Sequence, residues 1–77
     1  MTQVEWRDRF RNRLNSILYE RGISQNRLAR DSGLSTSRIN EYVSGKAIPT
    51  VFAVVNLAYA LDTSPGELVD FGERVFK

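Results

Sequence analysis

The stretch SQNRLARDSGLSTSRINEYVSGK, residues 24–46, decides the fold of this chain. Ser24 and Ser35 are good N-caps, and each is placed to begin a short helix. Gly33 lies between these two helices, where a tight turn needs the positive φ that glycine readily adopts. A short helix, a tight turn and a second short helix predict a helix-turn-helix unit at about residues 24–44.

Small and apolar residues in this stretch indicate how the two helices pack. Ala29 leaves room for a close crossing, and Leu34 and Ile39 fill the space between the helices. Tyr42 and Val43 continue the inward face of the second helix. The opposite face of that helix is therefore predicted to be exposed.

Apolar residues recur at helical spacing over the rest of the chain. In the first helix they run from Trp6 to Leu18, and Gly22 is a natural stop. The segment Ser64-Pro65-Gly66-Glu67 is interpreted as a capping box with proline at the first helical position, which would begin a short last helix. We expect an all-α, compact five-helix fold in a single domain over residues 1–77, with helices at about Val4–Arg21, after Ser24 through Ser32, over Thr36–Ser44 and Val51–Leu61, and a last one carrying Leu68, Val69 and Phe71.

The composition excludes several classes of function. The 77 residues include no cysteine and no histidine, which removes the usual zinc ligands and the commonest general base. We therefore expect no enzyme activity, no metal and no cofactor, and no small-molecule ligand is evident. No apolar run approaches the length of a membrane span, and the first 20 residues are too rich in arginine for a signal peptide. A cytoplasmic protein without a membrane partner is the expectation.

The net charge of +2 is unevenly distributed. Residues 1–46 hold nine basic and five acidic side chains, a net +4, and residues 47–77 hold two basic and four acidic, a net −2. The first part is therefore suited to a polyanion and the second is not. Arginines can also simply solvate the exposed face of a helix. This is the favoured interpretation of the four arginines in the middle of the first helix: Arg7, Arg9, Arg11 and Arg13. Arg13 could also approach the backbone of a nucleic acid.

The exposed face of the second helix of the unit carries short and medium polar side chains. A helix in the major groove reads base edges with such a face, mainly from its N-terminal turns. Glu41 on this face reduces the attraction to phosphates. Its carboxylate suits the amino group of a cytosine; alternatively, it only pairs with a neighbouring arginine. The expected base-reading residues are Thr36, Ser37, Asn40 and Glu41.

Contacts to DNA phosphates are expected around this face. Gln25 and Ser35 lie at helix N-termini, where backbone N–H groups and the helix dipole favour an anion. For Arg38, a phosphate contact, a base contact and simple solvation all remain open. The expected phosphate-contacting residues are Gln25, Ser35, Arg38, Ser44 and Lys46.

The chain resembles the Cro/phage-repressor (XRE-type) helix-turn-helix family in three segments: ISQNRLA at 23–29, SGLS at 32–35 and INEYVSGK at 39–46. The resemblance covers roughly residues 10–70. It implies a lambda-repressor-like five-helix domain that binds DNA as a dimer on a two-fold operator. It also implies that Gln25 contacts phosphate and braces the reading residues. Further matching positions are Pro49, Leu57, Ala58, Leu61 and Leu68, and the resemblance gives base-reading and phosphate-gripping roles to Thr36, Ser37, Asn40, Glu41, Ser44 and Lys46.

Two positions depart from the pattern of that family. The family often has a buried ion pair between an Arg late in the first helix and a Glu at the end of the reading helix. Leu18 and Val43 stand at these positions here, and we expect the two side chains to touch. The family also favours glycine after the fourth helix, where this chain has Asp62. Neither departure lies on the face expected to meet DNA.

The fourth helix is apolar nearly all the way round, which packing on one face does not require. Five of its residues suffice to cover the core: Val51, Val54, Leu57, Ala58 and Leu61. A second stripe remains, and together with apolar residues near the C-terminus it predicts a homodimer interface, since a small monomer should not leave such a patch in water. The expected interface residues are Phe52, Val55, Tyr59, Phe71, Val75 and Phe76. Alternatively, the C-terminal residues cover Phe52 and Tyr59 within one chain.

Two classes of function remain open. The first is a transcription regulator that binds double-stranded DNA sequence-specifically as a homodimer at an operator: a phage or prophage-type repressor, a Cro-like protein, or a restriction-modification controller. The second is a protein-interaction module on the same fold, such as an antitoxin or anti-repressor. The polar reading face and Lys46 favour the first class, because a module that only grips a protein is free to lose them.

Overall fold

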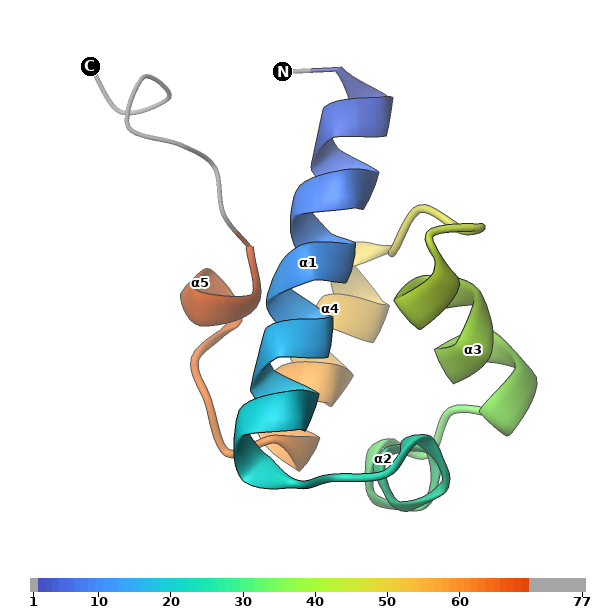
Figure 1. Ribbon diagram of the computed structural model, residues 1–77, viewed down its shortest axis with the longest axis vertical. Helices are drawn as coiled ribbons and strands as arrows, with labels where there is room; N and C mark the ends of the chain where they lie inside the picture. Colours follow the sequence, from blue (N-terminus) through green and yellow to red (C-terminus); the bar gives the residue numbers. More distant parts are fainter. Residues whose placement is uncertain (1, 70–77) are drawn as a thin grey trace.

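The computed structural model describes residues 2–69, and within them the chain forms five helices and no strand (Figure 1). The expected all-α five-helix fold is confirmed, and the bounds of the first four helices agree with expectation to within one residue. No described helix combines the length and the apolar character needed to cross a bilayer. The helices are α1 (Gln3–Arg21), α2 (Gln25–Ser32), α3 (Thr36–Ser44), α4 (Val51–Ala60) and α5 (Pro65–Leu68).

Hydroxyl side chains begin the first four helices. Thr2, Ser24, Ser35 and Thr50 each have extended backbone, and each side-chain oxygen accepts a hydrogen bond from the backbone N–H three residues later. Each of these bonds is 3.1 Å long. Such caps satisfy one of the N–H groups that lack a partner at a helix start, and each typically contributes about 1 kcal/mol. The N-caps predicted at Ser24 and Ser35 are confirmed.

The start of α5 differs from the expected capping box. The Ser64 side chain makes no capping hydrogen bond. The Glu67 N–H instead donates to the backbone carbonyl of Ser64 at 3.0 Å, so the hydroxyl is not needed there. The Glu67 carboxylate accepts from the Thr63 hydroxyl. The helix ends at Leu68, and Val69 is already extended, with φ −108° and ψ 106°; Phe71 lies outside the described residues.

All five helices contribute to one apolar core. In Figure 1, α1 stands at the centre with α4 behind it, α3 on one side and α5 on the other. Trp6, Leu34 and Val43 are partly buried and pack against this core. The buried residues are Phe10, Leu14, Ile17, Leu18, Leu28, Ala29, Ile39, Tyr42, Ala53, Val54, Leu57, Ala58, Leu61, Leu68 and Val69.

The expected core face of α4 is wrong at one position. Val51 is 78% exposed, whereas Ala53 is 2% exposed and takes its place in the core. At 100° per residue, Val51 lies about a quarter of a turn from the centre of the face formed by Val54 and Leu57. Val51 therefore adds to the apolar surface of α4 instead of the core.

Two arginines of α1 bind the ends of other helices. Arg13 donates from Nε to the carbonyl of Glu67 at 2.9 Å, and Arg21 donates to the carbonyl of Leu61. Carbonyls at helix ends have no partner within the helix, so these bonds tie the ends of α5 and α4 to α1. Arg13 thus reaches toward α5, on the side of α1 opposite α3 in Figure 1, rather than only solvating the helix.

The position after α4 has the backbone conformation for which glycine is usual. Asp62 has a φ of 53°, the only positive φ of a residue other than glycine within residues 2–69. Aspartate tolerates this region better than most residues, because its short polar side chain can bond locally. The glycine expected from the family is thus replaced by one of the few residues suited to the same turn.

Candidate nucleic-acid interface

α2 and α3 form the predicted helix-turn-helix unit. Each buries one face in the core, through Leu28 and Ala29 of α2 and Ile39 and Tyr42 of α3. Gly33 joins them with a φ of 75°, as the turn requires. In Figure 1, α2 is seen end-on while α3 is seen from its side, so the two helices cross steeply. The outward face of α3 is left open to solvent.

An open hollow of about 520 Å³ lies over this outward face. Its walls come from the first residue of α2, from α3, and from the loop after α3. Every expected base-reading residue lines it, together with two of the five expected phosphate-contacting residues: Gln25, Thr36, Ser37, Asn40, Glu41 and Lys46. Residues that are 21 positions apart in sequence therefore meet in one surface. Side-chain amides and charged side chains both border the hollow.

Gln25 and Asn40 are hydrogen-bonded across the hollow. The Asn40 Nδ2 donates to the Gln25 Oε1 at 3.5 Å, which is long for such a bond. With its oxygen turned toward Asn40, the Gln25 amide has its nitrogen left to donate to an anion. This geometry links a residue at the N-terminus of α2 to one on the exposed face of α3.

Glu41 forms an ion pair with Arg38, as one of the interpretations of the sequence expected. The Arg38 Nη1 and the Glu41 Oε1 are 3.6 Å apart, and the side chains are 53% and 44% exposed. Exposed pairs of this kind contribute little stability, typically under about 1 kcal/mol. Both side chains can therefore exchange this contact for one with a ligand at small expense.

The two serines expected at phosphates have partners within α3. The Ser35 side-chain oxygen accepts from the Arg38 N–H at 3.1 Å, and the Ser44 hydroxyl donates to the Glu41 carbonyl at 3.3 Å. Neither serine lines the hollow, and Arg38 does not line it either. The structure thus divides the expected phosphate-contacting set into Gln25 and Lys46 within the hollow and three residues beside it.

Tyr42 supports this face from beneath. It is 4% exposed and packs against the core. Burial raises the pKa of the Tyr42 hydroxyl above its ordinary value; Arg38 works against this shift and Glu41 adds to it. The exposed ion pair of α3 therefore lies within electrostatic reach of a buried phenol.

Two residues of α1 reach the end of α3, and sequence reasoning missed both. Asn15 donates from Nδ2 to the backbone carbonyl of Val43 at 3.0 Å. Arg11 lies against Gly45, whose missing Cβ would be 2.8 Å from the Arg11 Nη1. A bond from a side chain to a backbone carbonyl 28 residues away leaves no mark in a residue pattern. The only available signal was the four-residue spacing of Arg11 and Asn15, which puts them on one face of α1.

A second exposed surface lies on α4. Phe52 and Tyr59 are 72% and 81% exposed, and Val55 is half-buried. Val51 and Val55 also border an apolar groove of about 210 Å³. The other residues of the groove are Trp6, Val54, Pro65, Gly66 and Val69. The remaining residues expected at a dimer interface, Phe71, Val75 and Phe76, lie outside the described residues.

The hollow over α3 is lined by polar side chains that can form hydrogen bonds with a ligand. Within residues 2–69 no three side chains of the types that bind metals come together in a way that could hold an ion. The hollow offers amide, hydroxyl, carboxylate and ammonium groups at a helix face. Such groups can pair with base edges in the major groove and with the phosphates of the backbone that borders it.

Comparison with known proteins agrees with this geometry. The sequence pattern of the Cro/C1-type HTH DNA-binding domain matches residues 13–73. Among solved structures, the restriction-modification controller protein C.AhdI from Aeromonas hydrophila is similar in fold, with a TM-score of 0.74. The two sequences are 35% identical, and the match covers 78% of this chain and 91% of that chain. A search of curated protein sequences gives no match.

Proposed function

The chain belongs to the Cro/C1-type helix-turn-helix family and is a DNA-binding transcription regulator; from this premise we propose that it binds a two-fold operator as a homodimer, with α3 in the major groove. The family and the fold are those of DNA-binding regulators and not of enzymes. The observation that carries the proposal is the open hollow that gathers Gln25, the four polar residues of α3 and Lys46.

Thr36, Ser37, Asn40 and Glu41 are proposed to read base edges. Thr36 and Ser37 lie in the first turn of α3, and Asn40 and Glu41 follow one turn later, so all four share the outward face. An asparagine amide suits adenine, and a carboxylate suits the amino group of cytosine. In this account Glu41 leaves Arg38 when it meets DNA, which the weak exposed pair allows.

Residues on both sides of α3 are proposed to hold the DNA backbone. Gln25 sits at the first position of α2, where the N–H groups of the first turn and the helix dipole attract a phosphate. Ser44 is the last residue of α3 and Lys46 lies in the loop after it, and both are proposed to contact phosphates at that end of the helix. Ser35 and Arg38 complete the proposed set. Phosphate contacts of this kind set orientation on the duplex but read no sequence.

A homodimer is proposed to form through the exposed stripe of α4. Phe52 and Tyr59 present large apolar side chains to solvent, and the charge of residues 47–77 is unsuited to DNA. Two copies joined there would direct both reading helices to one side of the duplex. They could then enter successive major grooves about 34 Å apart. Phe71, Val75 and Phe76 are kept in this proposal on their sequence alone.

Regulation of a restriction-modification operon is the role favoured among those that the sequence left open. The support is the similarity to C.AhdI, whose own description is a restriction-modification controller protein. A phage-type repressor uses the same fold and the same reading face. The interaction-module alternative is less well supported, because the polar face of α3 is exposed and unobstructed.

The experiment is selection of bound duplexes from a random DNA pool, followed by sequencing. We expect an enriched palindrome whose half-sites are about 10 base pairs apart, centre to centre. A palindrome upstream of a restriction or modification gene in the source genome would support the controller role. Enrichment of a single half-site without symmetry would contradict the dimer, and a pool with no enriched sequence would contradict specific DNA binding.

A further inference from the structure

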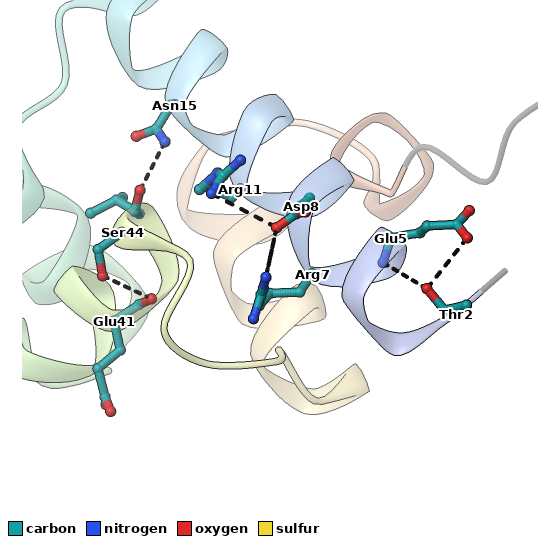
Figure 2. A network of polar contacts seen from close by, with 9 residues as sticks. Thr2, Glu5, Arg7, Asp8, Arg11, Asn15, Glu41 and Ser44 are labelled. Carbon is teal, nitrogen blue, oxygen red and sulfur yellow. Dashed lines mark hydrogen bonds and ion pairs between the residues drawn. The ribbon is translucent and has the colours of Figure 1, made fainter.

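The C-terminal end of α3 is held by a side chain of α1. The last carbonyls of a helix have no partner inside it, and the structure must satisfy them in another way. The Glu41 carbonyl accepts from the backbone N–H of Lys46 at 2.8 Å. The Val43 carbonyl accepts from the Nδ2 of Asn15 at 3.0 Å. Figure 2 shows Asn15 reaching from α1 to the last turn of α3, beside Ser44.

A second side chain of α1 lies one helical turn before Asn15 and faces the same place. The Arg11 guanidinium packs against Gly45, and its Nη1 is 3.7 Å from the Asp8 carboxylate (Figure 2). The last turn of α3 contains no basic residue of its own. Arg11 therefore supplies the positive charge that favours the C-terminal end of a helix dipole. Asn15 thus lies in a polar contact zone between α1 and the end of α3.

Apolar side chains also pack between these two helices, where the rings of Phe10 and Tyr42 meet. Phe10 and Leu14 of α1 are buried, as are Ile39 and Tyr42 of α3. Apolar packing sets the distance between helices but does not fix the direction of a particular group, whereas a hydrogen bond does. Resembling proteins often have a buried ion pair here, and this chain has Leu18 and Val43 instead. The bond from Asn15 is thus a directional contact between α1 and the end of α3.

We propose that Asn15 is a positioning residue for base reading: it fixes the orientation of α3 on the core and so sets the register of the reading face on DNA. The inference rests on the proposed function of α3 in the major groove. Asn15 touches no base in this account and acts through the Val43 carbonyl. Reading requires side chains to be held within about 0.5 Å of their working geometry, so a loosened α3 should read less well.

The consequence separates specific from non-specific binding. Base contacts depend on geometry, while phosphate contacts are electrostatic and tolerate small displacements. Loss of the Asn15 bond should therefore weaken binding to the operator and leave binding to unrelated DNA unchanged. The dependence of binding on salt should also stay the same, because no contact to a phosphate is lost.

Asn15→Ala is the test variant, and Asn12→Ala is its matched control. Both replace an exposed asparagine of α1 by alanine, so both change helix propensity alike. Dissociation constants are measured for the duplex selected by the wild type and for a scrambled duplex of the same length. Measurements run over a salt series, at a temperature where melting curves show each protein to be folded.

For Asn15→Ala we expect operator affinity to fall roughly threefold to tenfold, as for one net hydrogen bond, with affinity for scrambled DNA within about twofold of wild type. Asn12→Ala should match the wild type on both duplexes. An unchanged ratio of operator to scrambled affinity in Asn15→Ala would overturn the proposal. So would an equal loss on both duplexes. A wild type that prefers no sequence would instead overturn the proposed function.

Asn15→Asp separates hydrogen bonding from packing. The aspartate has nearly the same shape, but as a carboxylate it accepts hydrogen bonds and cannot donate to the Val43 carbonyl. It should lose the preference for the operator at least as strongly as Asn15→Ala. In a ¹H–¹⁵N spectrum, both variants should shift the amide of Ser44, whose peptide unit contains that carbonyl. An aspartate variant that keeps the wild-type preference would show that shape alone matters, against the proposal.

Discussion

Phe10 and Tyr42 meet edge to face between α1 and α3, with ring centroids 5.8 Å apart and ring planes at 81°. Both rings are buried, at 1% and 4% exposure. Aromatic pairs in this arrangement add about 0.5–1.5 kcal/mol beyond the apolar area that they bury. The reading helix is therefore anchored by a ring on the side opposite the surface proposed to meet DNA.

Tyr42 should make the fold sensitive to alkaline pH. Burial raises the pKa of Tyr42 in the folded protein, so folding favours the neutral phenol. The stability that depends on the neutral form is complete below the unfolded pKa of about 10 and is lost as the pH rises through the higher folded pKa. Between pH 9 and 11, the free energy of unfolding of Tyr42→Phe, measured with urea, should therefore fall less than that of the wild type. Tyr19→Phe, at a position 90% exposed, is the control and should follow the wild type. Equal alkaline losses in all three proteins would contradict this prediction.

Leu18 and Val43 are predicted to touch. Leu18 is buried, and Val43 packs against the same core. Val43→Glu should place a charge there without a partner, and removal of one partner from a buried pair typically costs about 3–5 kcal/mol. Because Val43 is partly exposed, the loss should lie below that range. Leu18→Arg added to Val43→Glu should recover part of it. Thermal melts of the two single variants and the double variant decide the matter, and strictly additive losses would show that the side chains do not meet.

Gly45 and Gly33 offer a matched pair for measuring the Arg11 contact. Their φ values are 77° and 75°, so alanine is strained by a similar amount, about 1–2 kcal/mol, at either position. Only at Gly45 would the new Cβ also meet Arg11. Gly45→Ala should therefore destabilise slightly more than Gly33→Ala, because the arginine side chain must move. In an Arg11→Ala background the two changes should become equal. Urea midpoints give the comparison, and an excess that persists without Arg11 would contradict the contact.

Phe52 tests the dimer. Phe52→Asp places a charge in the proposed apolar interface without disturbing the core, since this side chain is 72% exposed. We expect wild type to be dimeric at micromolar concentration in sedimentation equilibrium and Phe52→Asp to be monomeric with an unchanged melting profile at low concentration. Tyr19→Asp, at an exposed aromatic residue of α1, is the control and should stay dimeric. A wild type that remains monomeric at high micromolar concentration and on DNA would contradict the dimer model.

Local signals in the sequence predicted the elements and much of the site. Serine N-caps and glycine turns act within a few residues, so α2 and α3 could be placed from residues 24–46 alone. The exposed face of α3 followed from its helical period. Long-range geometry could not be obtained in this way. The exposure of Val51 depends on the angle at which α4 meets the core. Asn15 and Arg13 bind backbone carbonyls that are distant in sequence.

The most direct test of the central claim compares residues proposed to read bases with a residue proposed to hold phosphate. Lys46→Ala should weaken binding to every sequence alike and should reduce the salt dependence by about one ion. Ser37→Ala and Glu41→Ala should instead change the preferred base at one operator position, by about 1–3 kcal/mol. The measurement is binding of each variant to a panel of single-base operator variants. A changed base preference confined to the α3 variants is the predicted result, and reading-face variants that rank every operator variant as the wild type does would contradict the placement of α3 in the groove.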